Sequence, residues 1–204
     1  MIVYQDKDIV VCEKPYGVSS QKSGGENMVD MLTQLCGCEI YPVHRLDTQT
    51  TGLMVYAKSQ KSAAALSQAV ANGKLKKEYL CLCHGTVEGK GEMTDYLYHD
   101  RIKNKSFVTK NSRGGSKLAQ LKYEVLSQKQ AGECTVLLVK VELLTGRTHQ
   151  IRVQFASRGY PLLGDGKYGA RDKEKIHLHS SFLSFPHPTT GKITEFYSPP
   201  EWSK

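Results

Sequence analysis

The apolar segments of this chain are short, and their length sets the first limit on its fold. The two longest, Thr135–Val141 and Gly52–Ala57, have the length of β-strands. A membrane-spanning helix needs about 20 consecutive apolar residues, so no segment is predicted to cross a membrane. The first residues lack the basic and then apolar regions of a secretory signal. We therefore expect a cytoplasmic protein that is rich in short strands.

Two helices are predicted by residues that cap helix ends. Asn27 can accept a hydrogen bond from the first turn of a helix over Met28–Leu35. Ser59 can do the same for an alanine-rich helix that includes Ala63–Ala71, and Gly73 stands where a left-handed C-terminal residue is favoured.

The order of the remaining elements predicts the fold class. Tyr79–His84 and Lys122–Leu126 resemble strands, His149–Arg158 resembles a third helix, and Lys103–Lys117 is typical of a mobile loop or hairpin tip. Strands and helices are interspersed without a regular βαβ rhythm, which favours an α+β fold with a mixed sheet over a doubly wound sheet. No repeat or linker divides the chain, so we expect a single domain over residues 1–204.

The charge balance indicates a polyanionic partner. The 204 residues contain 28 Lys and Arg against 20 Asp and Glu, a net charge of +8, and clustered cations bind phosphates with release of counterions. Five cations lie in one basic insertion: Lys103, Lys105, Lys110, Arg113 and Lys117. That insertion is equally consistent with a solvated loop and with a phosphate-binding surface.

Metal and dinucleotide sites are not supported by spacing. The six cysteines form C-x-C pairs or stand alone, without the repeated pairs of zinc modules, so we expect reduced, buried thiols. His177, His179 and His187 do not make a convincing ligand set. The G-x-G-x-x-G sequence at Gly164–Gly169 follows a proline-containing loop rather than a strand, so it does not predict nucleotide binding.

One polar segment, His44–Gly52, reads H-R-L-D-T-Q-T-T-G and precedes a strand. It can present Asp47 at the surface of a sheet. Local sequence alone favours a simpler interpretation, in which Asp47 bonds to a nearby backbone amide in an Asx-turn.

A second polar segment, Leu144–Arg152, places Arg147, His149, Gln150 and Arg152 in a loop and the first turn of a helix. Free backbone N–H groups at such a position attract anions. The segment is therefore a candidate phosphate or carboxylate site, although a solvated basic turn has the same composition.

Together the two segments resemble the RluA-type pseudouridine synthases. His44–Gly52 differs from the family's H-R-L-D-x-x-T-S-G only at Thr51, and Gly146–Arg152 is the family's G-R-T-H-Q-I-R unaltered. Weaker features follow in the family's order, and the resemblance extends from about residue 9 to 202. These features are Glu13–Gly17, Lys77–Tyr79 with Gly85, Leu163–Gly169, Leu178–His179 and His187–Pro188.

The resemblance implies the pseudouridine synthase fold, with a mixed, mostly antiparallel sheet flanked by helices and loops and a central catalytic cleft. It also implies isomerisation of specific uridines in ribosomal or transfer RNA, after the target nucleotide leaves its stack. No cofactor and no metal are expected, because breaking and re-forming bonds within one nucleoside needs neither. We expect a monomer whose partner is RNA, and no N-terminal S4-type domain.

By resemblance Asp47 is the nucleophile or essential carboxylate, and Arg152 is its basic partner in the same cleft. Tyr79 matches the family's active-site tyrosine, although a half-buried strand aromatic has the same sequence context. Arg45 matches the arginine that can occupy the place of the flipped nucleotide. The remaining substrate-binding candidates are His44, Arg147, His149 and Gln150, of which His44 also fits a structural role in the loop and His149 and Gln150 also fit a role in orienting Arg152.

Two other interpretations remain open. The chain could be an RNA-binding module on the same scaffold that has lost turnover, or a ribosome-assembly factor for which isomerisation is incidental. The presence of Asp47, Tyr79 and Arg152 together favours an enzyme, because RNA binding needs cations and has no use for a carboxylate that faces a polyanion.

Overall fold

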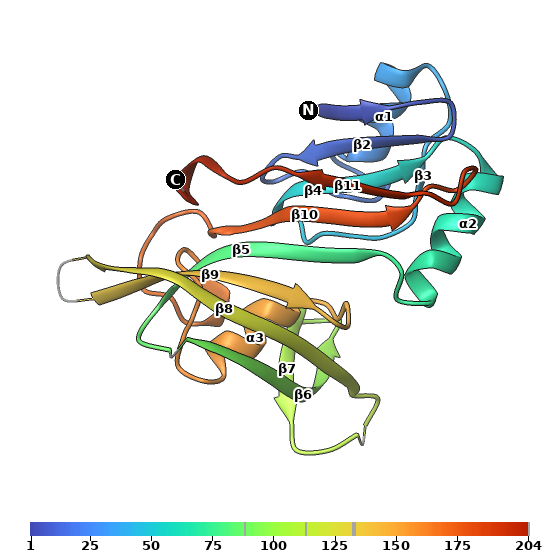
Figure 1. Ribbon diagram of the computed structural model, residues 1–204. Coiled ribbons are helices and arrows are strands. Elements are labelled where there is room, and N and C mark those ends of the chain that lie inside the picture. Colours follow the sequence, from blue (N-terminus) through green and yellow to red (C-terminus); the bar gives the residue numbers. More distant parts are fainter. Residues whose placement is uncertain (88, 113, 132–133, 204) are drawn as a thin grey trace. The chain divides into compact units, whose positions relative to one another are not determined.

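The computed structural model describes residues 1–87, 89–112, 114–131 and 134–203 (Figure 1). These residues form two compact units. The first comprises residues 1–77 and 179–202, and the second comprises residues 78–178 with Ser203. The prediction of one domain over residues 1–204 stays a prediction.

The first unit contains strands from both ends of the chain. They are β1 (Ile2–Gln5), β2 (Ile9–Lys14), β3 (Tyr41–Pro42), β4 (Thr51–Ala57), β10 (Leu178–Pro186) and β11 (Ile193–Tyr197). They pair in the order β1-β2-β4-β10, with β3 on β4 and β11 on β10. Only β4 and β10 are parallel, with Thr51 opposite His179, so the predicted mixed, mostly antiparallel sheet is confirmed here.

Both predicted helices of the first unit are present, with the predicted caps. The Asn27 side chain accepts from the Asp30 N–H at the start of α1 (Met28–Cys36). The Ser59 side chain accepts from the Ser62 N–H at the start of α2 (Gln60–Ala71), and Gly73 is left-handed with φ 66°. Figure 1 shows α2 beside β3 and β4.

The core of the first unit follows from strand alternation. Leu53, Val55 and Ala57 lie on one face of β4, next to Leu66 of α2 and Phe185 of β10, and all five are fully buried. This packing holds the start of β4, which directly follows the segment that carries Asp47.

The second unit contains a fully antiparallel set of strands. They are residues 78–84 of β5 (Lys76–His84), β6 (Lys90–Asp100), β7 (Lys105–Thr109), β8 (Lys117–Ala131) and β9 (Cys134–Leu143). Their order is β5-β9-β8-β6-β7. The strands expected at Tyr79–His84 and Lys122–Leu126 are confirmed.

Two features of the second unit differ from the prediction. The segment Lys103–Lys117 is neither a loop nor a hairpin tip throughout, because β7 occupies Lys105–Thr109 within it. Arg113 of this segment lies outside the described residues. Strand β6 was not predicted, since Met93 and Leu97 are its only buried residues and its other positions are mostly polar.

The third helix, α3 (Gln150–Ala156), is shorter than the predicted His149–Arg158. His149 adopts the left-handed conformation with φ 56° and therefore stands before the helix rather than in it. Val153 packs with Leu97 and Ala119, and Tyr168 of the 3₁₀ helix η1 (Gly166–Tyr168) lies against this cluster. A last 3₁₀ turn, η2, spans Glu201–Ser203.

Among the described residues, no helix has both the length and the apolar character that crossing a membrane requires. All six cysteines are unbridged. Cys134 is exposed, so the sequence-based interpretation of this residue as a buried thiol was wrong.

Candidate active site

Asp47 lies in the loop before β4 and is partly buried. The chain is held on both sides of it. The Thr50 N–H donates to the Asp47 main-chain oxygen at 2.9 Å, and the Ser20 hydroxyl donates to the Leu46 oxygen at 2.9 Å while it accepts from the Leu46 N–H. The position of the Asp47 backbone is thus determined by contacts with a distant segment and not by the loop alone.

A buried lysine also holds this loop. The Nζ of Lys14, which is 1% exposed, donates to the main-chain oxygens of Pro15, Val18 and Thr48 at 2.9, 2.8 and 3.0 Å. Burial lowers the pKa of Lys14 to about 8, and the charge of Asp47 opposes this shift. Lys14 therefore connects the segment Glu13–Gly17 to Thr48, the residue after Asp47, and places a positive charge near the Asp47 carboxylate.

The start of β4 explains two positions of the same motif. The Thr51 hydroxyl lies 2.7 Å from His179 Nδ1, and His179 Nε2 lies 2.9 Å from the Ser198 oxygen. A carbonyl can only accept, so Nε2 carries the proton and the Thr51 hydroxyl donates to Nδ1. Gly52 has φ 107°, and a Cβ there would lie 2.3 Å from the Ser180 oxygen, so this strand pair requires glycine.

His44 and Arg45 have opposite environments. His44 is buried, and its Nε2 accepts from the Val55 N–H at 3.1 Å. Burial, and then the charge of Lys77, lower the pKa of His44 well below its usual value, so the ring is neutral and holds the loop against β4. Arg45 is exposed, and its guanidinium has no protein partner among the residues that the structure describes.

Tyr79 lies on β5 opposite Val141 of β9 and is 4% exposed. Within the second unit Tyr79 is therefore a buried aromatic residue of a strand, as the alternative interpretation of the sequence expected. Its role in the reaction stays a prediction.

Arg152 on α3 forms a paired contact with a carboxylate. Its Nε and Nη2 donate to Asp165 Oδ2 and Oδ1 at 2.7 and 2.8 Å, and the two side chains are 2% and 1% exposed. Two parallel charge-assisted bonds fix both the distance and the plane of the guanidinium. Gly164 permits the preceding turn, since a Cβ there would lie 2.2 Å from the Lys175 oxygen.

Tyr168 contacts the same guanidinium through its ring. The Arg152 Cζ lies 5.2 Å from the ring centroid, and the Lys105 Nζ lies 5.1 Å from it. The Tyr168 hydroxyl accepts from the Ser106 N–H at 2.8 Å and lies 2.9 Å from His149 Nδ1. Tyr168 thus links Arg152 to strand β7.

The other predicted residues of the second motif mainly shape its loop. The Gln150 side-chain oxygen accepts from the Thr145 hydroxyl and the Arg147 N–H, and its amide donates to the Gln120 oxygen at 3.0 Å. His149 is buried against Tyr168. Arg147 is partly exposed, and its Nε donates to a main-chain oxygen at 2.8 Å.

Comparison with known proteins determines the family. The RNA pseudouridylate synthase family matches residues 8–157, a range that includes the Asp47 loop and the Arg152 motif. The chain belongs to this family.

Relatives in the RNA pseudouridylate synthase family match nearly the whole chain. An uncharacterized RNA pseudouridine synthase of Mycoplasma pneumoniae is 34% identical over 96% of this chain and 65% of its own length. The ribosomal large subunit pseudouridine synthase D of Vibrio cholerae is 33% identical over 97% of this chain and 66% of its own length. The chain thus spans about two thirds of the length of these relatives.

Solved structures confirm the fold of this family member. Human RNA pseudouridylate synthase domain containing 1 superposes with a TM-score of 0.82 at 24% identity, covering 98% of this chain and 82% of that protein. The domain-containing 4 protein gives 0.79 at 23% identity, covering 98% and 89%. The predicted α+β pseudouridine synthase fold is confirmed.

One residue that the structure places beside Arg152 had no role predicted from the sequence. Asp165 lies in the segment Leu163–Gly169, which was noted only as a family feature. The one signal in the sequence was an acidic residue between two glycines. Asp165 lies thirteen positions after Arg152, and no periodic pattern relates the two residues, so their contact could not be predicted.

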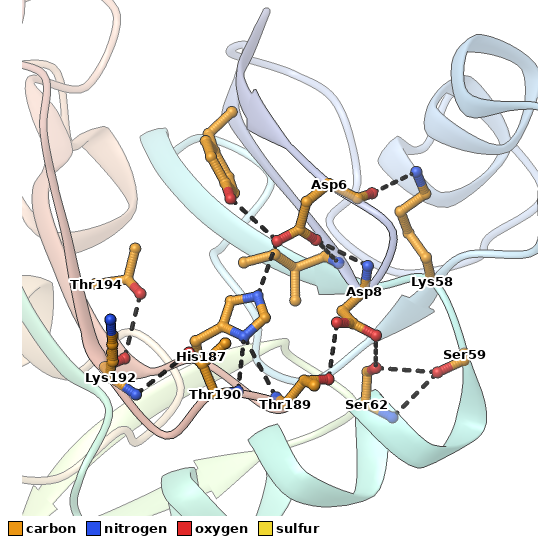
Figure 2. Close-up of polar contacts among 12 residues, drawn as sticks. Asp6, Asp8, Lys58, Ser59, Ser62, His187, Thr189, Thr190, Lys192 and Thr194 are labelled. Carbon is orange, nitrogen blue, oxygen red and sulfur yellow. Dashed lines mark hydrogen bonds and ion pairs between the residues drawn. The ribbon is translucent and has the colours of Figure 1, made fainter.

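A cluster elsewhere in the first unit has the composition of a metal site. Asp6, Asp8 and His187 place their ligand atoms within 4.8 Å of one another. Figure 2 shows these three side chains gathered in one cluster. His187 Nδ1 accepts from the Thr189 and Thr190 N–H groups, both at 3.3 Å.

The hydrogen bonds of this cluster argue against metal binding. Since Nδ1 of His187 accepts, its Nε2 carries the proton and donates to Asp6 Oδ2 at 2.8 Å (Figure 2). A metal ion would need the lone pair of a ring nitrogen, and both nitrogens are engaged. The Asp8 carboxylate accepts from the Thr189 and Ser62 hydroxyls. The cluster instead fastens the β10–β11 turn to the β1–β2 turn.

Proposed function

We propose that this protein is an RNA pseudouridine synthase that isomerises specific uridines to pseudouridine. The observation that carries the proposal is the family match over residues 8–157, which includes a carboxylate, Asp47, on a loop held by Lys14 and Ser20. A site that must hold a nucleophile in one direction benefits from such positioning.

The reaction needs only groups within the nucleoside and the protein. The bond between C1′ and N1 breaks, the base rotates, and a bond forms between C1′ and C5. The proton at C5 leaves to solvent, and N1 gains a proton. In this proposal the Asp47 carboxylate attacks either C1′ or C6, because an aspartate is ionised at neutral pH and is chemically able to do both.

The other candidates have supporting roles in the proposal. Arg152, which Asp165 holds in one plane, provides a fixed guanidinium toward the reacting groups. Tyr79 contacts the target nucleotide. Arg45, whose guanidinium is exposed, takes the place of the target base in its stack, since a planar cation can both stack and hydrogen-bond.

We further propose ribosomal RNA as the substrate and the cytoplasm as the compartment. The supporting observation is the name of two relatives. The ribosomal large subunit pseudouridine synthase D of Vibrio cholerae is 33% identical to this chain, and the ribosomal large subunit pseudouridine synthase C of Buchnera aphidicola is 29% identical. Transfer RNA is the alternative substrate.

Tritium release tests the reaction, because isomerisation replaces the hydrogen at C5. Purified protein is incubated with ribosomal RNA or transfer RNA transcripts that contain [5-³H]uridine, and released tritium is counted. We expect release from large-subunit ribosomal RNA. Release from transfer RNA alone would reassign the substrate, and release from neither, together with an unchanged pseudouridine map in a strain lacking the gene, would favour the RNA-binding or assembly-factor interpretation.

A further inference from the structure

The second unit contains a pocket of about 600 Å³ beside the turn between β6 and β7. Its walls come from the end of β6 and the following turn (residues 97–102), from Gly115 and Lys117 before and at the start of β8, and from the Gly146–Thr148 part of the Arg152 motif. The volume lies within the range of about 300–1,000 Å³ that is typical of small-ligand sites.

Three cations line this pocket, and the protein does not neutralise them. Arg101 and Lys117 are exposed, and neither side chain has a hydrogen-bond or ion-pair partner in the described part of the chain. Among the residues that the structure describes, Arg147 bonds through its Nε alone, which donates to the Leu118 oxygen at 2.8 Å. This bond holds the base of the guanidinium and leaves its two terminal nitrogens available.

Asp100, the one acidic residue among the described residues that line the pocket, does not offset these charges. Asp100 Oδ1 accepts from the Ile102 and Lys103 N–H groups, both at 3.0 Å. The carboxylate thus closes the turn, and the formal charge of the lining residues is positive.

The cations on another face of the same unit are arranged differently. Each of three lysines there lies against a glutamate: Lys90 with Glu124 at 2.8 Å, Lys122 with Glu92 at 3.3 Å, and Lys140 with Glu124 at 3.3 Å. Unpaired cations are therefore not a general property of this sheet, and their gathering at the pocket favours a polyanionic ligand.

The pocket also offers a group suited to a nucleobase. The Ser106 hydroxyl donates to the Thr148 oxygen at 2.6 Å and so accepts from His99 Nδ1 at 3.1 Å. In the neutral ring this leaves Nε2 of His99 as an acceptor, and no described residue bonds to it.

We propose that this pocket is a second nucleotide subsite, which binds a single-stranded RNA nucleotide other than the target uridine. Arg101, Lys117 and Arg147 bind its phosphodiester oxygens, and His99 contacts its base. The inference rests on the proposed function in that it takes RNA as the substrate. Of its residues, Arg147 was already a predicted substrate-binding residue, and none is among the predicted catalytic residues Asp47, Tyr79 and Arg152.

Salt-dependent binding tests the subsite. The probe is a fluorescein-labelled oligouridylate of about 12 nucleotides, and its affinity is measured by anisotropy between about 50 and 300 mM KCl. Each phosphate contact with a single strand contributes about 0.7 to the slope of log K against log salt concentration. For Arg101→Gln/Lys117→Gln/Arg147→Gln we expect the slope to fall by about 2 and the affinity to fall at least about tenfold.

The matched control removes the same charge from the other face. Lys90→Gln/Lys122→Gln/Lys140→Gln changes the net charge equally, and we expect its slope and affinity to stay close to those of the wild type. Equal weakening by both variants, or no weakening by the first, would overturn the subsite. If the first variant does not fold, Arg101→Gln/Lys117→Gln retains the Arg147 bond to Leu118, and a slope that falls by about 1.4 is expected.

Tritium release separates this inference from the proposed function. If the wild type releases tritium, Arg101→Gln/Lys117→Gln should show a higher KM for RNA and a kcat close to that of the wild type, since the pocket holds a nucleotide that does not react. An unchanged KM would contradict the subsite. Absence of release by the wild type would count against the proposed function, while the binding measurements would still decide whether the pocket binds RNA.

Discussion

Arg152 and Asp165 are joined by two hydrogen bonds of 2.7 and 2.8 Å, and both side chains are almost fully buried in the second unit. Burying two charges is favourable only when each satisfies the other, and removing one partner typically costs about 3–5 kcal/mol. The pair therefore affects both the stability of the second unit and the direction in which Arg152 can act.

Asp165→Asn should lower both the stability of the second unit and the rate of the reaction. Asparagine has one acceptor oxygen and directs an amide at the guanidinium, so Arg152 loses its fixed plane. We expect the free energy of unfolding to fall by about 3–5 kcal/mol. We also expect kcat of the folded variant to fall by about 10–100-fold, with KM for RNA nearly unchanged. Urea unfolding and tritium-release kinetics measure the two effects.

The control for this variant is Asp172→Asn, in the same region of the chain. Asp172 bonds to His84 at 2.8 Å and is 19% exposed, so its loss should affect stability and leave kcat unchanged. A folded Asp165→Asn protein with the wild-type kcat would show that Asp165 has only a structural role.

Lys14 predicts a pH effect on stability. Burial lowers its pKa from 10.5 to about 8, so between these pH values the unfolded chain binds more protons than the folded one. The contribution of Lys14 to the free energy of unfolding therefore rises with pH in this window, by up to about 3 kcal/mol. The difference in unfolding free energy between wild type and Lys14→Met should shift in favour of the wild type from pH 8 to pH 10, and a constant difference would refute this.

The hydroxyl at position 51 predicts which replacements are tolerated. Thr51 donates to His179 Nδ1, so Thr51→Ser keeps the bond and should change the free energy of unfolding by less than about 0.5 kcal/mol. Thr51→Val keeps the shape and leaves His179 without a donor, at an expected cost of about 1–2 kcal/mol. Equal stabilities of the two variants in urea would mean that the bond contributes nothing.

Asp6 predicts a loss of stability in acid. Burial alone would raise its pKa, but the Ile9 and Asp8 N–H groups, His187 and Tyr4 outweigh burial and lower it. A carboxyl whose folded pKa is lowered stabilises the fold above its unfolded pKa, and this contribution disappears as the pH falls through the folded value. Wild type should thus lose more stability between pH 6 and pH 3 than Asp6→Asn does, and parallel curves would contradict this.

The helices of the first unit could be predicted because their signals are local. Asn27 and Ser59 cap helices through bonds to residues three positions on, and such spacing is visible in a sequence. Strand β6 has no such local signal, because its residues are mostly polar. It is a strand because it pairs with β7 and β8, which the local sequence does not reveal.

The candidate site divides in the same way. Asp47 and Arg152 were identified from motifs, but the residues that fix their positions were not. The contact of Lys14 with Thr48 spans 34 residues and that of Ser20 with Leu46 spans 26, and such distances depend on the tertiary fold. For His44 the sequence left both a substrate-binding and a structural role open, and the structure shows that the Val55 N–H of β4 occupies its Nε2.

The role of Asp47 is the central claim, and Asp47→Asn tests it most directly. The variant keeps the size of the side chain and removes the nucleophilic charge. We predict that tritium release from uridine-labelled ribosomal RNA falls by more than about 10³-fold, while the affinity for the same RNA stays within a few-fold of the wild type. Release at the wild-type rate by a folded Asp47→Asn protein would contradict the account.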